Sequence, residues 1–309
     1  MDKDIYQDIR VNGETVYHGR RNCETRWQVL KPFMERFRHH PTFRVLDFGA
    51  NYGYFSWRIH EDYPQAHITT VDSRPILKVL YKINKPDNMV QLDNMDTDML
   101  REHAENNQYD VILLMSILHH FDNYEEILEI FQSMSDHIII EADYPHKPNF
   151  KHNEKEIHTH LMSKNITQLN KWITHDRPIY HLNDNEISMK GIVASGSGLA
   201  KQSVTIINKL FNWVGESMYP GTLNLGIDRP LYFNWRVYLD AYVICEMYLN
   251  GLPVLMIRDT TRPYDPARLE LMSPYYLRDY FDLNDHSPVV VSVDKRNEYD
   301  GELPEGWRW

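Results

Sequence analysis

The first residues that could do chemistry lie in the segment 45–56, which reads VLDFGANYGYFS. In this segment Asp47 ends an apolar run, and Gly49 and Gly53 follow it. Glycine tolerates positive φ and lets a ligand come close to the backbone. Ligands of open parallel sheets bind where such a strand turns into a helix. The spacing is G-x-x-x-G without a P-loop lysine, so a phosphate loop is disfavoured and a cationic ligand is favoured.

A second acid ends the next predicted strand. Asp72 closes the run 67–72 and lies 19 residues after Gly53. A carboxylate at this position can accept two hydrogen bonds from ribose hydroxyls. The plainer alternative is an acid that only begins the turn Asp-Ser-Arg-Pro. The glycine loop upstream favours the ribose interpretation.

Two histidines follow another apolar strand. His119 and His120 come after the run YDVILLM at 109–115. A histidine there can act as a general base on an acceptor hydroxyl, or orient the acceptor. An acceptor that is already anionic needs no strong base, so the histidines would then only position it. The alternative role is packing and capping of the next helix.

Three arginines lie in the polar N-terminal segment. They are Arg20, Arg21 and Arg26. The guanidinium fork binds carboxylate and phosphate groups with two parallel hydrogen bonds. These side chains could therefore hold an anionic group of a cofactor or an acceptor. The alternative is that they are exposed arginines at the start of a helix.

Strand and helix signals alternate around these residues. Strands are predicted at 44–48, 67–72, 89–92, 109–115, 137–141 and 178–182, and helices at 26–39, 54–61, 76–83, 124–134 and 166–174. This alternation predicts a doubly wound parallel sheet of the α/β, Rossmann-like type. The polar stretch 145–165 contains His152, His158 and His160. We interpret it as a solvated connector rather than a zinc site, since no third ligand has suitable spacing.

The segments 45–56 and 109–121, together with Asp72, resemble motifs of class I S-adenosylmethionine-dependent methyltransferases over about residues 16–145. The resemblance implies that the glycine loop holds the methionine end of the cofactor, that Asp72 binds its ribose, and that Asp93 or Asn94 lies near the adenine. It implies His119 and His120 as catalytic residues. The implied cofactor-binding residues are Arg20, Arg21, Arg26, Asp47, Gly49, Asn51, Gly53, Asp72, Asp93 and Ser116.

The order of the phrases NCETRW, VLDFGANYGYFS and SILHHF has a narrower likeness. It resembles the methyltransferase part of the kinase–methyltransferases that cap bacterial O-antigen chains, which phosphorylate a terminal sugar and methylate that phosphate. By this likeness, the arginine cluster would hold the cofactor carboxylate or a phosphate acceptor.

The C-terminal part contains three further phrases, at 191–204, 219–225 and 262–283. The first is a glycine loop whose N–H groups could bind phosphate. In the second, Thr222 and Asn224 alternate around a leucine, so both side chains share one strand face. Two neutral oxygen ligands could hold Mg²⁺ if substrate phosphates supply most of the charge. Taken alone, the phrase PGTLNL is more typical of a turn followed by an ordinary strand than of a metal site.

Together the three phrases resemble the archaeal CTP-dependent riboflavin kinases, a small and mostly β barrel, over about residues 187–293. The resemblance implies magnesium ligands at Thr222 and Asn224 and an acceptor contact at Glu270. For the nucleotide it implies contacts at Ser195, Gly196, Ser197, Gly198, Tyr275 and Arg278, and we add Lys201 as a phosphate contact. The family's G-x-G-E-G loop and Thr-His phrase are altered here, the latter at Arg262, so the acceptor is predicted to differ from riboflavin.

The composition limits the alternatives. The chain has 309 residues and a net charge of −11, which favours two domains and argues against general binding to nucleic acid or anionic membranes. It has two cysteines and no CxxC pair, so a reducing cytoplasm is expected. The N-terminal residues do not resemble a signal peptide. No apolar stretch reaches the length of about 18 residues that a membrane span needs.

The sequence therefore predicts a methyltransferase domain at 1–185 and a CTP-dependent kinase-like β-barrel domain at 186–309. The predicted enzyme phosphorylates a hydroxyl group of a glycan or related metabolite. It also transfers a methyl group from S-adenosylmethionine, and the newly installed phosphate is one candidate methyl acceptor. Its expected cofactors are S-adenosylmethionine and Mg²⁺, with CTP as phosphate donor. The sequence does not determine the oligomeric state, and a homo-oligomer is one alternative. The alternatives are a methyltransferase of a small molecule or protein with a regulatory barrel, a riboflavin kinase fused to a methyltransferase, and a non-enzymatic scaffold.

Overall fold

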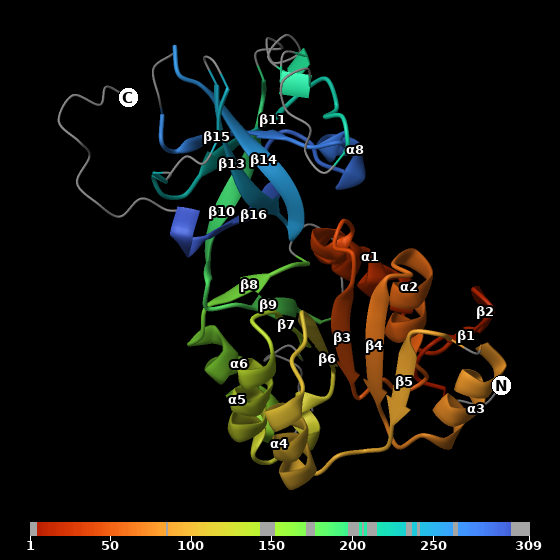
Figure 1. Cartoon of the computed structure of the whole chain (residues 1–309). Helices are drawn as coiled ribbons and strands as arrows, with labels where there is room; N and C mark the ends of the chain where they lie inside the picture. The colour runs from red at the N-terminus through yellow and green to blue at the C-terminus, as the bar shows by residue number, and fades with distance from the viewer. Residues whose placement is uncertain are drawn as a thin grey trace. The chain divides into compact units, whose positions relative to one another are not determined.

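The computed structural model describes residues 5–84, 86–142, 152–170, 177–196, 204–205, 207–208, 215–232, 237–239, 242–261 and 265–297 (Figure 1). The chain forms two compact units. The first holds most residues up to Asp184, and the second begins in the main at Asn185. No helix among the described residues is long and apolar enough to cross a bilayer.

The first unit is built on a seven-stranded mixed sheet with the order β5-β4-β3-β6-β7-β9-β8. Strands β3 to β7 are parallel, whereas β9 runs antiparallel to β7 and β8 antiparallel to β9. The chain order reverses between β3 and β6, which is the point where doubly wound sheets bind ligands. The strands are β3 (Phe43–Phe48), β4 (Ala66–Val71), β5 (Met89–Leu92), β6 (Val111–Met115), β7 (Ile138–Glu141), β8 (Ile166–Gln168) and β9 (Ile179–Leu182).

The central strands are buried because they are apolar along their whole length. Every residue of β6 and β7 is buried, as expected for parallel strands with both faces covered. Helices α4, α5 and α6 contribute Leu100, Phe131 and Leu161 to one core with these strands. The helices are α1 (Cys23–Met34), α2 (Tyr54–Asp62), α3 (Pro75–Asn84), α4 (Thr97–Asn106), α5 (Tyr124–Met134) and α6 (His152–Met162), with short 3₁₀ turns at Glu35–Phe37 and Leu118–His120. The predicted doubly wound α/β architecture is confirmed.

Four elements of the first unit differ from the predictions. A hairpin, β1 (Ile9–Val11) and β2 (Glu14–Tyr17), lies in the polar lead-in, and its turn residues Asn12 and Gly13 both have positive φ. Asn-Gly is a strong hairpin signal that we overlooked. Helix α4 was also missed, although Asp96 caps it by accepting a hydrogen bond from the Met99 N–H at 2.9 Å.

The other two differences concern the segment after β7. Part of the polar connector forms α6, and residues two apart on a helix point to different faces, so His158 and His160 do not form the H-x-H strand geometry. The helix predicted at 166–174 is wrong at its start, where β8 pairs with β9; residues 171–174 lie outside the described residues. The secondary structure of this segment depends on pairing with a distant strand, which local periodicity does not predict.

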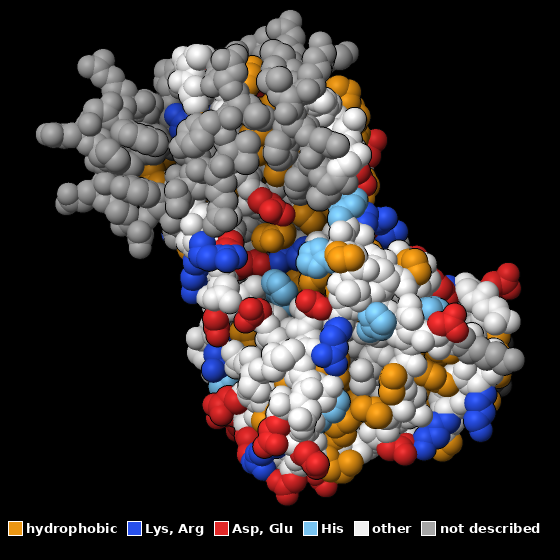
Figure 2. All heavy atoms as spheres, viewed as in Figure 1, with side chains coloured by type: hydrophobic (Ala, Val, Ile, Leu, Met, Phe, Trp, Pro, Cys, Tyr) orange, Lys and Arg blue, Asp and Glu red, His pale blue; other side chains and the backbone are white. Residues whose placement is uncertain are grey.

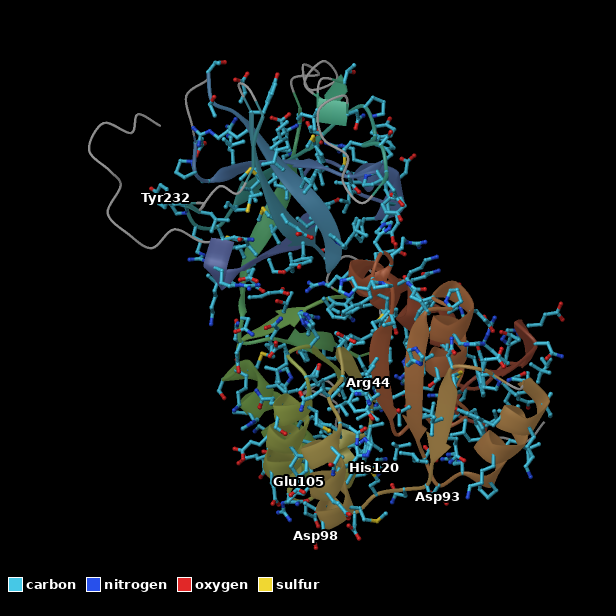
Figure 3. All side chains as sticks on the ribbon, in the orientation of Figure 1. Arg44, Asp93, Asp98, Glu105, His120 and Tyr232 are labelled. Atoms are coloured by element: carbon cyan, nitrogen blue, oxygen red, sulfur yellow. The ribbon has the colours of Figure 1, made fainter. Side chains whose placement is uncertain are left out.

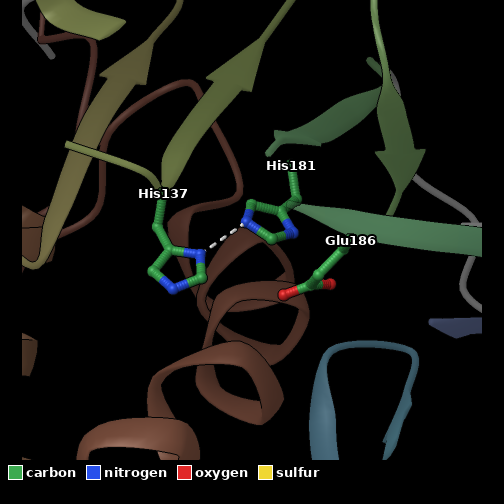
Figure 4. A group of neighbouring side chains, drawn as sticks. All are labelled: His137, His181 and Glu186. Atoms are coloured by element: carbon green, nitrogen blue, oxygen red, sulfur yellow. Dashed lines mark hydrogen bonds between the residues drawn. The ribbon is translucent and has the colours of Figure 1, made fainter. Parts of the chain in front are cut away.

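A histidine pair joins β9 to the start of β7. His137 Nδ1 lies 3.0 Å from His181 Nε2 (Figure 4). Asn183 Nδ2 lies 3.1 Å from the same His137 nitrogen. His181 is buried, so these bonds satisfy ring nitrogens that have lost water. The pair therefore helps to hold the antiparallel strand at this edge of the parallel sheet.

Asp47 ties β3 to α2. Its carboxylate is 1% exposed and accepts a hydrogen bond from Ser56 Oγ at 2.6 Å. The pKa of Asp47 is raised to about 6, mainly by burial; the Ser56 hydrogen bond opposes this shift and the charge of Asp72 adds to it. Burying a carboxylate penalises its charged form. Asp47 thus links the end of β3 to α2, and the free-energy cost of burying its carboxyl group increases when the group ionises.

The second unit is an antiparallel sheet with the order β12-β13-β14-β15-β11-β10-β16. Strand β16 also pairs with β13, through Tyr248↔Ser292 and Leu249↔Val291, so six strands form a closed ring of pairings around an apolar core. Its elements are β10 (Glu186–Ala194), β11 (Leu223–Ile227), β12 (Val237–Leu239), β13 (Tyr242–Leu249), β14 (Leu252–Asp259), β15 (Arg268–Met272), β16 (Pro288–Asp294), α8 (Leu277–Tyr280) and a 3₁₀ turn at Lys295–Asn297. The sequence also predicts a helix at 203–214, but most of this segment lies outside the described residues.

We predict a pH-dependent stability difference between the wild type and Asp47→Asn. In the folded protein the Asp47 pKa lies above its ordinary value of 3.8, at about 6, so the folded state binds more protons in this interval. The free energy of unfolding of the wild type, relative to the variant, should therefore fall by up to about 3 kcal/mol as pH rises through the interval. Chemical denaturation at a series of pH values measures this difference. A difference that does not change with pH would contradict the assignment.

Candidate functional site

The carboxyl ends of β3, β4 and β6 surround a cavity of about 780 Å³ in the first unit. This volume is in the range of small-molecule sites. Three loops supply most of its lining: the loop after β3 with Gly49 and Asn51, the loop after β4 with Asp72, and the loop after β6 with His119 and His120. Figure 3 shows His120 beyond the tips of these strands.

Asp72 fastens two of these loops. Its Oδ2 accepts a hydrogen bond from the Asn51 N–H at 2.7 Å, and its Oδ1 accepts one from the Arg74 N–H at 2.9 Å. Asn51 has a φ of 60°, so this bond also holds a backbone conformation that non-glycine residues rarely adopt. A carboxylate has about four lone-pair sites. Asp72 can thus hold the loops and still accept hydrogen bonds from a ligand.

Gly49 is required by the close approach of two loops. Its φ is 80°, and a Cβ at this position would lie 2.7 Å from Cγ1 of Ile117 in the loop after β6. The Gly49 N–H donates to the Val71 carbonyl at 2.8 Å. A side chain here would push Ile117 into the cavity. The glycine therefore allows the β3 and β6 loops to pack against each other beside the cavity.

His119 and His120 lie side by side at the mouth of the cavity. Their ring centroids are 4.2 Å apart, and both rings line the cavity. His119 is half-buried and His120 is exposed. They belong to the 3₁₀ turn that follows β6, whose Leu118 is buried beneath them. Both histidines can therefore reach an acceptor that enters from solvent.

The three predicted arginines do not act as one cluster. Arg20 lines the cavity, with its guanidinium carbon 5.2 Å from the ring centroid of Tyr6. Arg26 is fully buried and pairs with Glu141, and Arg21 Nη2 lies 3.1 Å from Glu141 Oε1. Because a buried carboxylate needs such partners, Arg21 and Arg26 have a structural role here, and neither lines the cavity.

Other predicted residues also lie outside the cavity lining. Asp47 is buried behind it, and Gly53, with a φ of 76°, precedes α2. Asp93 is exposed and its Oδ1 lies 2.6 Å from Lys78 Nζ, whereas its neighbour Asn94 lines the cavity. Asp47, Gly53 and Asp93 thus contribute nothing to the lining of this cavity.

Several lining residues were missed by sequence reasoning. Gln7 is buried, and its Oε1 accepts hydrogen bonds from the N–H groups of Tyr52 and Tyr54 at 3.3 and 3.5 Å. Arg177 lines the cavity from the segment before β9. Neither residue belongs to a motif, and each reaches the cavity only through the fold. Ser116, which was predicted, lines the cavity with a φ of 61°.

In the second unit, a small hollow of about 40 Å³ lies beside the predicted magnesium ligands. Its lining includes Thr222, Tyr275 and Arg278. Thr222 Oγ1 donates to Glu270 Oε1 at 2.8 Å, and Asn224 lies opposite Glu270 in the pairing of β11 with β15. The fold thus brings together residues that the sequence separates by almost fifty positions.

A second polar group links two predicted nucleotide segments. Ser195 Oγ donates to Asp285 Oδ2, and Arg278 Nη2 donates to Asp285 Oδ1 at 2.7 Å and to the Ala194 carbonyl at 3.2 Å. The Ser195 hydrogen bond and then the Arg278 guanidinium lower the pKa of Asp285. Sequence reasoning missed Asp285, which follows no motif. Gly196 is described next to Ser195, while the predicted positions Ser197, Gly198, Lys201 and Arg262 lie outside the described residues.

Comparison with solved structures finds several distant matches. A 2.2 Å crystal structure of WbdD is 12% identical, with a TM-score of 0.46 over 82% of this chain and 53% of that chain. The N-terminal domain of EvdMO1, in the presence of SAH and D-fucose, is 12% identical, with a TM-score of 0.41 over 58% and 91%. An O-methyltransferase family protein from Burkholderia thailandensis is 12% identical, with a TM-score of 0.35 over 50% and 56%. The chain spans about half the length of the WbdD structure.

A comparison with curated proteins found no match, whereas a comparison with family models did. Residues 18–175, just over half of the chain, match a family model described as a methyltransferase domain. The matched region contains the parallel strands and all three loops after β3, β4 and β6. This chain belongs to the methyltransferase-domain family.

Proposed function

We propose that the first unit transfers a methyl group from S-adenosylmethionine. The observation that carries the proposal is Asp72, whose carboxylate fastens two cavity loops and keeps acceptor capacity for ribose hydroxyls. Gly49 lines the same cavity, and the absence of a Cβ lets its loop pack against Ile117 of the β6 loop, so its backbone lies at the cavity wall. The family match at residues 18–175 supports the same assignment.

The residues of the chain would contribute mainly alignment. S-adenosylmethionine supplies a methyl group that its sulfonium already activates. Asp72 would hold the ribose and the Gly49 loop the methionine end, while Arg20 is available for the carboxylate. His119 and His120 would orient the acceptor, or accept its proton if it is a hydroxyl. Correct placement of two reactants can supply a large part of a rate enhancement.

For the second unit we propose CTP-dependent phosphorylation of an acceptor hydroxyl. The support is the grouping of Thr222 with the predicted nucleotide-contact residues Tyr275 and Arg278 around one hollow. Thr222 Oγ1 and Asn224 would hold Mg²⁺, which neutralises charge on phosphate oxygens. Leu223 at the start of β11 is buried, and Asn224 after it and Thr222 before it are half-buried. Glu270 would contact the acceptor.

The two reactions could act on one substrate. WbdD is described as a bifunctional kinase–methyltransferase. By analogy we propose that the hydroxyl belongs to a glycan or related metabolite and that methylation follows phosphorylation. The same analogy makes the new phosphate a candidate methyl acceptor. This coupling requires that methyl transfer depend on CTP.

A second candidate function is a methyltransferase of a small molecule or protein with a nucleotide-sensing second unit. The small size of the described hollow beside Thr222, about 40 Å³, favours it. Sites that hold a whole ligand usually measure about 300 Å³ or more. A regulatory contact needs less enclosure than a phosphoryl-transfer site.

Asp72→Ala should weaken binding of S-adenosylhomocysteine at least tenfold, because the variant loses both the loop fastening and the ribose acceptor. Isothermal titration calorimetry measures the Kd. Asp98→Ala is the matched control, since Asp98 is an exposed acid on α4 outside the cavity, and the Kd of this variant should stay within about twofold of the wild type. Equal losses in the two variants would contradict the role of Asp72.

Asn224→Ala should abolish Mg²⁺-dependent phosphate transfer from CTP and leave S-adenosylhomocysteine binding unchanged. The readout is transfer from γ-labelled CTP to a panel of glycan acceptors. Asn284→Ala, at an exposed loop of the same unit, serves as the control and should retain activity. Saturable CTP binding by a wild type that transfers no phosphate to any acceptor would favour the regulatory alternative.

Methyl incorporation from labelled S-adenosylmethionine should require CTP and Mg²⁺ if the reactions are coupled. ATP replaces CTP in the parallel reaction, and mass spectrometry of the product shows a phosphate and a methyl group added together. Methylation at the same rate without any nucleotide would refute the coupled scheme while leaving the methyltransferase assignment intact.

A further inference from the structure

Gln7 is a buried polar residue that the fold brings from the N-terminal segment to the loop after β3. Its side chain lines the cavity, and the residue is only 1% exposed. Its Oε1 accepts hydrogen bonds from the Tyr52 N–H at 3.3 Å and from the Tyr54 N–H at 3.5 Å. One amide oxygen thus serves two backbone donors of the loop that joins β3 to α2.

The backbone of this loop creates the need for outside acceptors. Asn51 and Gly53 have φ values of 60° and 76°, so Tyr52 lies between two residues in the left-handed conformation. Helix α2 begins directly after Gly53, which has no side chain that could cap the helix. The N–H groups of a first helical turn have no partner within their own helix. The loop and the helix start therefore present N–H groups that other parts of the chain must satisfy.

The acceptors of these N–H groups can be assigned one by one. Those other than the two bound by Gln7 have partners elsewhere: the N–H groups of Gly49 and Ala50 donate to the Val71 carbonyl, that of Asn51 to Asp72 Oδ2, and that of Gly53 to the Ala50 carbonyl. Tyr52 and Tyr54 are both buried, and Gln7 is the acceptor of their N–H groups. A buried donor that loses its partner costs more than the hydrogen bond contributes. Gln7 and Asp72 therefore hold the loop from two sides.

The segment that carries Gln7 is itself held in place. Residues 5–8 precede the β1–β2 hairpin, and the chain after the hairpin returns beside them. The Arg21 N–H donates to the Tyr6 carbonyl at 3.1 Å. A Cβ on Gly19 would lie 2.4 Å from the carbonyl carbon of Gln7, so only a residue without a side chain allows this approach. Gln7 thus reaches the loop from a fixed piece of backbone.

We propose that Gln7 is a positioning residue for the cofactor: its amide oxygen holds the loop after β3 in the shape that receives the methionine end. The proposal rests on the methyl transfer proposed above for the same cavity. Gln7 acts through the N–H groups of Tyr52 and Tyr54. A loop that is held before the ligand arrives loses less conformational freedom on binding, so affinity depends on this hold. Gln7 lies before residue 18, where the family match begins, so the site extends beyond the matched region.

The test compares Gln7→Met, which removes the acceptor but keeps a long side chain, with Gln7→Glu, which keeps an acceptor oxygen. In the ligand-free full chain, amide hydrogen exchange followed by NMR should be faster at Tyr52 and Tyr54 in Gln7→Met. The Asn51 N–H, which Asp72 accepts, is the internal reference and should change less. Calorimetry measures the Kd for S-adenosylhomocysteine, which should rise at least about fivefold in Gln7→Met and stay within about twofold of the wild type in Gln7→Glu.

Gln108→Ala is the matched control. Gln108 is exposed, follows α4 in the chain and does not line the cavity. Figure 2 shows acidic side chains gathered over the region of α4 and α5, so this part of the surface is polar and its neutral side chains can be changed without burying or exposing a core. Both the amide exchange of the loop and the Kd should match the wild type.

Each other outcome counts against the proposal. Faster exchange at Tyr52 and Tyr54 with an unchanged Kd would make Gln7 a cap of α2 without a role in binding. A raised Kd with unchanged exchange would assign Gln7 to direct contact with the ligand, and a Gln7→Glu variant as weak as Gln7→Met would exclude the acceptor role. Gln7→Ala replaces Gln7→Met if the latter does not fold. A wild type that does not bind S-adenosylhomocysteine would contradict the methyltransferase assignment itself, whereas the exchange measurement needs no ligand.

Discussion

The two hydrogen bonds that Asp72 accepts from backbone N–H groups are the interaction on which the candidate cofactor site depends. Parallel pairing of β3 with β4 and β6 brings three strand ends to one edge of the sheet, but pairing alone does not shape the loops beyond them. Asp72 joins the loop that contains Asn51 to the loop that contains Arg74. Buried and half-buried N–H groups need acceptors, so a carboxylate at this point satisfies the backbone and stays available to a ligand.

The arginines near the candidate site differ in whether they form an ion pair with Glu141. Arg21 and Arg26 neutralise this buried carboxylate, and breaking such a pair would leave an uncompensated charge inside the protein. Arg20 and Arg177 face the cavity. The ion pair and the candidate ligand site are thus connected through Ser116, which is bonded to both Glu141 and Arg177.

In the second unit, antiparallel strands bring together polar residues from distant parts of the chain. Its ring of pairings has one apolar interior, so each strand turns alternate residues outward. Thr222, directly before β11, meets Glu270 of β15, and Ser195 after β10 is linked through Asp285 to Arg278 of α8. Residues from distant parts of the chain thus form two neighbouring polar groups, which is the geometry that the proposed phosphoryl transfer or nucleotide sensing would use.

Local pattern in the sequence was enough to predict the parallel strands, the helices α2, α3 and α5, and the glycine turn after the first of these strands, because apolar periodicity and turn chemistry are properties of neighbouring residues. It could not decide that 166–168 pairs as a strand, since its partner lies more than ten residues away. Local pattern also could not predict that Arg26 forms a buried ion pair with Glu141, whereas Arg177 lines the cavity. The sequence determines which side chains are charged. Which charged side chains form pairs depends on tertiary packing, because only the folded structure determines which residues are buried next to one another.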